Sequence, residues 1–207
     1  MSIERRVQLV ERLFYQLEQD SAQFQHNSGI SCVSGCGKCC TSPDVEASPL
    51  EFLPWAFHLF LNGEAEKTLS ILKKNPNRNC LIYKPLSVVD QGRCSDYKYR
   101  GLICRLFGFA ANTDKYGSLR LATCKIIKEG QADKYNSAVE AMVKGLYVPV
   151  FTDYYMQLNQ IDFQLGNIIV PINKALAMAL EEVLQYYAYR SSTEKKRAVF
   201  KTSNDPS

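Results

Sequence analysis

Hydrophobic residues recur at helical spacing in the first segment of the chain. They are three or four positions apart, so they would form one apolar stripe along an amphipathic helix over residues 3–24. The stripe consists of Ile3, Val7, Val10, Phe14 and Leu17. Gly29 and the cysteine-rich loop that follows it are expected to end this helix.

A second helical pattern begins at the sequence "SPLE", residues 48–51. Ser48 as N-cap, Pro49 at the first helical position and Glu51 at the third form a capping box. The helix it opens would bury Leu50, Leu53, Phe57, Phe60 and Leu61. A short helix over about 64–74 should stop at "NPN", and residues 75–104 are rich in turn residues and irregular in pattern.

The alternating pattern in "LFGFAANTDKYGSLRLATC" predicts a β-hairpin. Its strands should lie near 107–111 and 118–122, with Gly117 in the polar turn. Antiparallel pairing would bring the two ends of this segment, Cys104 and Cys124, close together. A shared metal site would require this.

The remaining chain predicts helices over about 131–144, 152–165 and 171–189, the last beginning at Pro171. The expected fold class is mostly α with a small β-hairpin (α+β), around a cysteine-rich metal-binding core. We expect a single domain over residues 1–190, with a cysteine-cluster region at 30–127 and a helical part at 131–190. The polar residues 191–207 are expected to form a disordered tail.

Composition is that of an ordinary globular protein, with 46% hydrophobic and 22% charged residues among 207. No apolar run reaches the roughly 20 residues of a membrane span, and the N-terminus has no signal-peptide pattern. We therefore expect a cytoplasmic protein with reduced thiols and no membrane partner.

The formal net charge of +4 counts every cysteine as neutral. If all eight were metal-bound thiolates the charge would be −4, and two divalent ions would return it to zero. The basic composition is therefore no indication of nucleic-acid binding. Basic residues that adjoin cysteines, and could offset thiolate charge, are Lys38, Arg93, Arg105 and Lys125.

The segment "ISCVSGCGKCC", residues 30–40, holds four of the eight cysteines. Short spacings let a turn aim successive sulfurs at one metal, and Gly35 and Gly37 supply the backbone freedom. The adjacent Cys39 and Cys40 would point in different directions in an extended segment. They are therefore expected to serve two centres, or one would bind metal while the other supports it.

Three other interpretations of the cysteines are weaker. Core packing explains a single cysteine better than eight, and disulfides are typical of small secreted domains. The spacing of Cys32, Cys36 and Cys39 equals the signature of radical S-adenosylmethionine enzymes, but repeated strand–helix units are missing from the pattern. Metal chelation is favoured, through a set of candidate ligands that comprises Cys32, Cys36, Cys39, Cys40, Cys80, Cys94, Cys104 and Cys124.

The order of these cysteines resembles the CxxCxxCC, or YkgJ-type, cysteine-cluster family. The matching segments are "CVSGCGKCC", "VEASPLEFL", "NCLIY", "GRCSDYKYRGLICRLFGF" and "LATC", over about residues 30–127. The resemblance implies zinc or iron chelation, and some members are labelled iron–sulfur oxidoreductases. The chain departs from the family pattern at Gly101, where proline is common, and at Tyr97, which stands in "CSDY" instead of "C-x-I-Y".

Other candidate residues are few. Glu51 and His26 are the nearest alternatives to sulfur ligands, and Glu51 is explained by its cap; His58 is a weaker candidate. Two hypotheses remain. In the first, structural zinc organises a binding or accessory module, with a protein partner on its surface. In the second, iron, including a [4Fe–4S] cluster, serves an oxidoreductase or protein-modifying enzyme.

Overall fold

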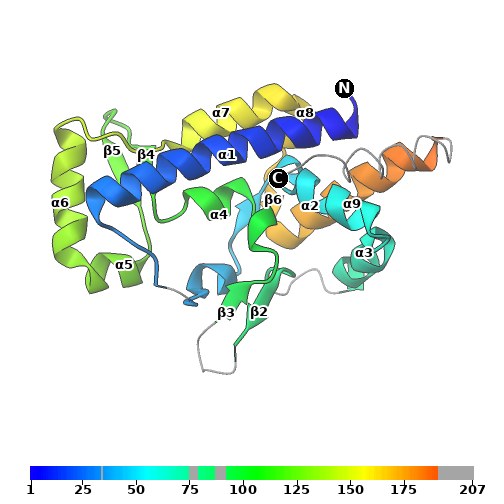
Figure 1. Ribbon diagram of the computed structural model, residues 1–207, viewed down its shortest axis with the longest axis horizontal. Helices are drawn as coiled ribbons and strands as arrows, with labels where there is room; N and C mark the ends of the chain where they lie inside the picture. Colours follow the sequence, from blue (N-terminus) through cyan, green and yellow to red (C-terminus); the bar gives the residue numbers. More distant parts are fainter. Residues whose placement is uncertain (34, 75–78, 87–91, 191–207) are drawn as a thin grey trace.

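The computed structural model describes residues 1–33, 35–74, 79–86 and 92–190. Within these residues the fold is mostly helical, with three short antiparallel strand pairs, as the sequence predicts. Helix α1 (Ile3–Ser28) runs along much of the length of the molecule, and other elements pack along it from one end to the other (Figure 1). The expected tail, 191–207, lies outside the described residues.

Helix α1 has defined caps at both ends. Ser2 accepts a hydrogen bond from the Arg5 backbone N–H at 3.2 Å. Gly29, with φ +67°, ends the helix and donates its N–H to the Gln25 carbonyl at 2.9 Å. Its 26 residues span about 39 Å, which is long enough to contact two separate hydrophobic cores.

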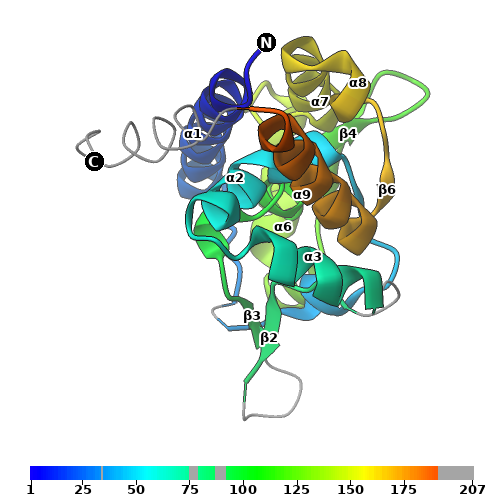
Figure 2. The same cartoon turned by 90° about the vertical axis from the view of Figure 1, so that its right-hand side faces the viewer.

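The first core surrounds the N-terminal half of α1. Helices α2 (Leu53–Leu61), α3 (Ala65–Lys74), α7 (Phe151–Ile161) and α9 (Ile172–Ala188) meet there (Figure 2). Arg6 of α1 is buried and pairs with Asp162 and Glu182, each at 2.7 Å. These ion pairs tie α1 to the C-terminal helices.

The second core lies at the other end of α1 and is smaller. It includes Phe24 of α1, Ile30 of the following loop and Leu121 of the β4–β5 hairpin. Helices α5 (Lys125–Gly130) and α6 (Ala132–Val143) contribute Ile127 and Met142. The cysteine-rich loop therefore begins at a residue of the second core.

The capping box at Ser48 is present, but the helix begins differently from the prediction. Residues Pro49–Phe52 form a 3₁₀-turn, η2, and the α-helix starts at Leu53. Pro54 has no N–H to donate to the carbonyl of Leu50, so α-helical bonding cannot pass through this point. The Leu53 N–H instead bonds the Leu50 carbonyl, as in a 3₁₀-turn.

The predicted hairpin is confirmed, as β4 (Ala110–Thr113) paired with β5 (Leu119–Ala122). A second hairpin, β2 (Tyr83–Pro85) with β3 (Gly92–Cys94), lies in the region that the sequence analysis expected to be irregular. The same region contains a 3₁₀-turn, η3 (Tyr97–Tyr99), and helix α4 (Leu102–Leu106). A third pair joins β1 (Glu46–Ala47) to β6 (Val170–Pro171).

The helix predicted over 152–165 is two helices, α7 and α8 (Phe163–Gly166). Asp162 breaks it, because its extended backbone places its carboxylate over the N–H groups of Gln164 and Leu165, each at 3.1 Å. Among the described residues, no helix has both the length and the apolar composition needed to span a membrane.

Candidate metal centre

Hydrogen bonds hold the two ends of the cysteine-rich loop against different parts of the fold. At its start, Ser31 exchanges two hydrogen bonds with the Gln131 side chain, at 3.1 and 2.7 Å, beside the end of α5. Further along, the Gly92 N–H of β3 donates to the Gly35 carbonyl at 3.1 Å. The loop therefore extends from α5 to the β2–β3 hairpin (Figure 1).

Contact between Gly37 and Gly92 is close. A Cβ at Gly37 would lie 2.5 Å from the Gly92 carbonyl oxygen, and Gly37 has φ +59°. Only glycine satisfies both conditions without a shift of the chain. Gly37 then leads directly into the 3₁₀-helix η1 (Lys38–Thr41), which carries the adjacent cysteines.

The expectation that Cys39 and Cys40 occupy an extended segment is wrong, because both belong to η1. Successive residues of a 3₁₀-helix are about 120° apart around the axis, so neighbouring side chains still start in different directions. The two thiols nevertheless interact with each other. Cys39 is exposed, and Cys40 is half-buried.

Three later cysteines pack against the first hydrophobic core. Cys94 ends β3 opposite Tyr83, and the Tyr83 N–H donates to the Cys80 carbonyl at 2.9 Å. Cys104 lies in α4, which packs against α1. All three side chains are half-buried beside this core.

Cys124 is held at the second core instead. It is the N-cap of α5, and its sulfur accepts a hydrogen bond from the Ile127 N–H at 3.4 Å. The predicted hairpin does bring the chain back from α4 to α5, but its two ends contact different cores.

All eight cysteines are free thiols, and two of them are exposed and six half-buried. A disulfide framework therefore does not describe them, and core packing accounts for only the four later cysteines. As they stand, no three described His, Cys, Asp or Glu side chains converge closely enough to hold one ion. Ligation would require these side chains to reorient.

The electrostatic neighbours of Cys32 lie in its own loop and at α5. Burial raises the pKa of Cys32, and negative charge on Cys39, Cys36 and Cys124 raises it further. Cys124 is thus an electrostatic neighbour of Cys32, while the hydrogen bonds between Ser31 and Gln131 lie at the opposite end of α5.

The electrostatic neighbours of Cys40 and Cys104 form a second group. The thiol of Cys39 and burial raise the pKa of Cys40, with further contributions from Cys104 and Cys80. Burial raises the pKa of Cys104, followed by charge on Cys80, Glu51, Cys39 and Cys94.

Burial, followed by charge on Cys94, raises the pKa of Cys80 to about 11. Thiolates in these positions would repel one another and would lose hydration, so each alone is costly to ionise. A divalent cation among them removes that cost, because metal binding favours the thiolate form. The donor set therefore fits a thiophilic metal such as zinc or iron.

Arg100 is the basic side chain that reaches both groups. Its positive charge opposes the effect of burial on the pKa of Cys32 and Cys94, and adds to the effect of the Cys40 thiol in lowering the pKa of Cys39. Its guanidinium stacks over Tyr97, 4.1 Å from the ring centre, and donates to the Tyr97 hydroxyl. Its Nε is buried without a hydrogen-bond partner among the described residues.

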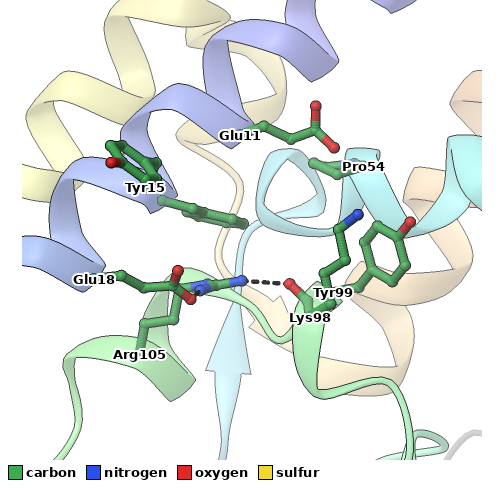
Figure 3. Close-up of a pocket in the computed structure, with 8 residues that line it drawn as sticks. Glu11, Tyr15, Glu18, Pro54, Lys98, Tyr99 and Arg105 are labelled. Carbon is green, nitrogen blue, oxygen red and sulfur yellow. Dashed lines mark hydrogen bonds and ion pairs between the residues drawn. The ribbon is translucent and has the colours of Figure 1, made fainter. Parts of the chain in front are cut away.

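Arg105 fixes the backbone that carries Arg100. Its guanidinium donates to the carbonyls of Arg100 at 3.0 Å and Lys98 at 2.5 Å, and it pairs with Glu18. It lines a pocket of about 430 Å³ between α1 and η3 (Figure 3), whose lining includes no cysteine. The sequence marks Arg105 as a candidate because it adjoins Cys104. Arg100 is marked only as part of the segment from Tyr97 to Phe107, which resembles the family pattern.

Glu51 is fully buried as a structural acceptor. Its carboxylate accepts from the backbone of Ser48 at 2.8 Å and of Ile103 at 3.0 Å, and from the Tyr155 hydroxyl at 3.2 Å. The interpretation as a cap is confirmed, and the same carboxylate also anchors α4, next to Cys104.

The two histidines have other surroundings. His26 is exposed in the last turn of α1. His58 stacks on Tyr99, with ring centres 4.8 Å apart, and contacts Asn62.

Residues 31–131 match the model of the CxxCxxCC family, whose description is "putative zinc- or iron-chelating domain". No curated protein and no solved structure gives a significant match to the chain.

Proposed function

Because residues 31–131 are a domain of the CxxCxxCC family, we propose that this domain chelates zinc or iron through its cysteine thiolates, in a structural or accessory role. Its metal would be a cross-link between segments that are far apart in sequence. The residues that would hold it are the eight cysteines between Cys32 and Cys124. When bound, the metal supplies charge neutralisation and bonds that fix these segments.

One observation carries this proposal: the loop that holds four cysteines lies between the other four. Its start is bonded to Gln131 beside α5, and its later part is bonded to Gly92 of β3. The loop therefore connects segments whose free cysteines pack beside the two hydrophobic cores. A hydrophobic core alone does not require this arrangement, whereas a chelate does.

A structural role is supported by the surroundings of the thiols. Eight thiolates can complete two four-coordinate sites, and a closed site leaves no position for a substrate. Glu51 is engaged by three donors, so it is not available as a general base at the cysteines. We place the protein in the cytoplasm, where such thiols stay reduced; any partner would then bind the surrounding surface.

Anaerobic purification followed by elemental analysis and a visible spectrum tests the proposal. Colourless protein with bound zinc, or brown protein with iron and sulfide, would support chelation and identify the metal. Protein that retains no metal, and takes up neither zinc nor ferrous iron with sulfide, would refute it.

Whether the site is closed can be measured separately. Cobalt-loaded protein is titrated with azide, and its visible spectrum is followed. A closed site predicts an unchanged spectrum. A saturable change with cobalt retained would show an open coordination position and contradict the structural role.

A further inference from the structure

The pocket between α1 and η3 has a size that suits a small molecule. Its volume of about 430 Å³ is within the roughly 300–1,000 Å³ typical of such sites. Four charged side chains, three aromatic rings and Pro54 line it, and none of these residues is a cysteine. A ligand of this pocket would therefore be held by residues other than the candidate metal ligands.

Two of the four charges in the pocket satisfy each other. Arg105 is buried, and each of its three side-chain nitrogens has an acceptor, in Glu18 and in the carbonyls of Lys98 and Arg100. Its guanidinium also stacks over Phe14, 4.4 Å from the ring centre. Arg105 and Glu18 therefore form a fixed wall of the pocket.

Glu11 and Lys98 carry the other two charges. Figure 3 shows both side chains extending into the same part of the pocket, Glu11 from α1 and Lys98 from η3. Burial raises the pKa of the Glu11 carboxyl and the charge on Lys98 opposes this, so the two groups are near enough to interact. Among the described residues, however, neither charged group has an ion-pair or hydrogen-bond partner. The pocket thus holds a carboxylate and an ammonium group that do not bond each other.

Aromatic rings lie beside these two charges. Tyr99 follows Lys98 in η3, and His58 stacks on its ring, with ring centres 4.8 Å apart. Tyr15 is one helical turn beyond Glu11 on the same face of α1, and it is 65% exposed. The two tyrosines offer a ligand flat apolar surface next to both charges.

The turn that carries Lys98 is fixed against the rest of the fold. The Trp55 Nε1–H of α2 donates to Asp96, the N-cap residue of η3, at 3.1 Å. Arg105 donates to the Lys98 carbonyl at 2.5 Å. The backbone position of Lys98 is therefore set before a ligand arrives, which lowers the entropy cost of binding.

A ligand with both an ammonium and a carboxylate group would satisfy both charges at once. A purely cationic ligand would leave Lys98 unpaired, and a purely anionic ligand would leave Glu11 unpaired. We propose that this pocket binds a free, zwitterionic amino acid with an aromatic side chain. Its ammonium group pairs with Glu11, its carboxylate pairs with Lys98, and its ring packs on Tyr99 and Tyr15. This proposal goes beyond metal chelation and does not depend on it.

Calorimetric titration of the full chain, with its metal retained, tests the proposal. L-Phenylalanine or L-tyrosine should bind saturably. Phenethylamine lacks the carboxylate and 3-phenylpropionate lacks the ammonium group, so each should bind about 10-fold or more weakly than phenylalanine. If either analogue bound as tightly as phenylalanine, the pocket would recognise only one charge and the proposal would be wrong. Dissociation constants above about 1 mM for both amino acids would also overturn it.

Substitutions assign the two contacts. Glu11→Gln should weaken phenylalanine binding by about 10-fold without weakening that of 3-phenylpropionate, which has no ammonium group to lose a partner. Lys98→Gln should weaken phenylalanine binding without weakening that of phenethylamine. Lys115→Gln is the matched control, because Lys115 is also exposed and lies over a neighbouring tyrosine, Tyr116, but far from the pocket in the β4–β5 turn. Unchanged ratios of the three affinities in both pocket variants would place the binding elsewhere and contradict the proposal.

Discussion

At the scale of single residues, Arg100 is the cation that would offset thiolate charge at the proposed metal centre. It acts on Cys32 and Cys39 of the cysteine-rich loop and on Cys94 at the end of β3. Tyr97 stacks against its guanidinium plane, and Arg105 donates a hydrogen bond to its backbone carbonyl. The unpartnered Nε–H is free to donate to a sulfur, the kind of supporting bond that stabilises metal-bound ligands.

Arg100→Ala should therefore weaken zinc binding by about 10–100-fold, the usual cost of losing such a supporting group. Arg100→Lys keeps the charge but loses the Nε donor and the planar stack, so it should recover only part of the affinity. Competition with a chromophoric chelator at fixed pH measures both variants. Arg120→Ala is the matched control, because Arg120 is exposed and pairs with Asp114 in the β4–β5 turn. Equal affinity for Arg100→Ala and wild type would rule out the role.

The surroundings of Gly101 explain why this chain has glycine where the family pattern commonly has proline. Its φ of −65° would suit the proline common at this position in the family. A Cβ there, however, would lie 2.7 Å from the ring of Phe52 and 2.9 Å from Glu51 Oε2. In this chain the bulk of Phe52 takes the space that another residue would need.

Gly101→Ala should lower the free energy of unfolding by about 1–3 kcal/mol through overpacking. Urea denaturation at equal metal load measures this. In Gly101→Ala/Phe52→Leu the loss should be smaller than the sum of the single losses, because the two side chains compete for one space. Gly130→Ala is the control, since nothing lies within 4 Å of its Cβ. If Gly101→Ala were as stable as Gly130→Ala, the steric account would be wrong.

The sequence indicates candidate ligands more directly than the residues that would support them. Cysteine spacing and the Glu51 cap depend on local order, which a sequence shows directly. Arg100 is four residues from Cys104 in the sequence, yet the cysteines on which it acts, Cys32, Cys39 and Cys94, belong to other segments. Those relationships arise only when η1, β3 and α4 meet, and no short-range pattern contains them.

At the scale of elements, the approach of η1 to β3 depends on Gly37. A side chain at this position would clash with the Gly92 carbonyl. The residue that carries it would also have to adopt the left-handed backbone conformation of Gly37. Gly37→Ala should therefore separate η1 from β3 and weaken metal binding by the thiols of both segments.

Gly117→Ala provides the control for this substitution, because Gly117 also has a positive φ, +82°, but nothing lies within 4 Å of its Cβ. It should show only the backbone cost, about 1–2 kcal/mol in the free energy of unfolding. Gly37→Ala should lose more stability and, unlike Gly117→Ala, should lose zinc affinity. Equal behaviour of the two variants would show that the close approach is unimportant.

The hydrogen bond from Tyr187 to Glu4 joins α9 to α1 in the first core. Burial alone would raise the pKa of Glu4, but hydrogen bonds from Tyr187, its own backbone and Ser2 outweigh burial and lower it. A lowered carboxyl pKa stabilises the fold above the unfolded value of about 4.5. This stabilisation is lost as the pH falls through the lower folded pKa.

Tyr187→Phe keeps the ring stacked on Phe60 but removes the bond. It should cost about 1 kcal/mol at neutral pH, and the difference from wild type should shrink as the pH falls below about 4.5. Urea denaturation across pH 3–7, a range chosen to bracket that value, measures it. Tyr189→Phe, at a residue 94% exposed on the same chain end, should change nothing. A difference that is constant with pH would contradict the assignment to Glu4.

Element prediction succeeded where hydrophobic periodicity was long or a turn signal was clear. The helix over 3–24 and the β4–β5 hairpin are examples. The β2–β3 hairpin was missed because its strands have three residues each, too few to show alternation. The helix break at Asp162 was missed because the apolar spacing continues through it, while the cap and the ion pair to Arg6 decide the structure.

At the scale of the whole molecule, the sequence did not reveal two hydrophobic cores joined by α1 and the cysteine-rich loop. Helical periodicity shows which face of a helix is apolar but not which partner covers it. The presence of two separate cores matters because Cys124 packs against one of them and Cys80, Cys94 and Cys104 pack against the other. Bound metal would add coordination bonds across a boundary that α1 and strand β4 also span, the latter through its contacts with α7 and the bridge between Ala111 and Val150.

Removal of metal should therefore loosen the molecule unevenly. The loop and the β2–β3 hairpin bury little apolar surface of their own, so ligation would offset most of the entropy lost in ordering them. Hydrogen exchange followed by mass spectrometry should show faster exchange after chelation in residues 30–41, 79–86 and 92–106 and in α5. Helices α2, α3 and α9 should stay protected, because they pack on one another in the first core, and among the described residues only Asn173 near the start of α9 bonds the segment that holds Cys80. Protein treated with zinc-saturated chelator is the control. Equal loosening of α9 and the loop would mean that metal supports the whole fold, and no loosening at all would mean that the cores hold the cysteines in place without it.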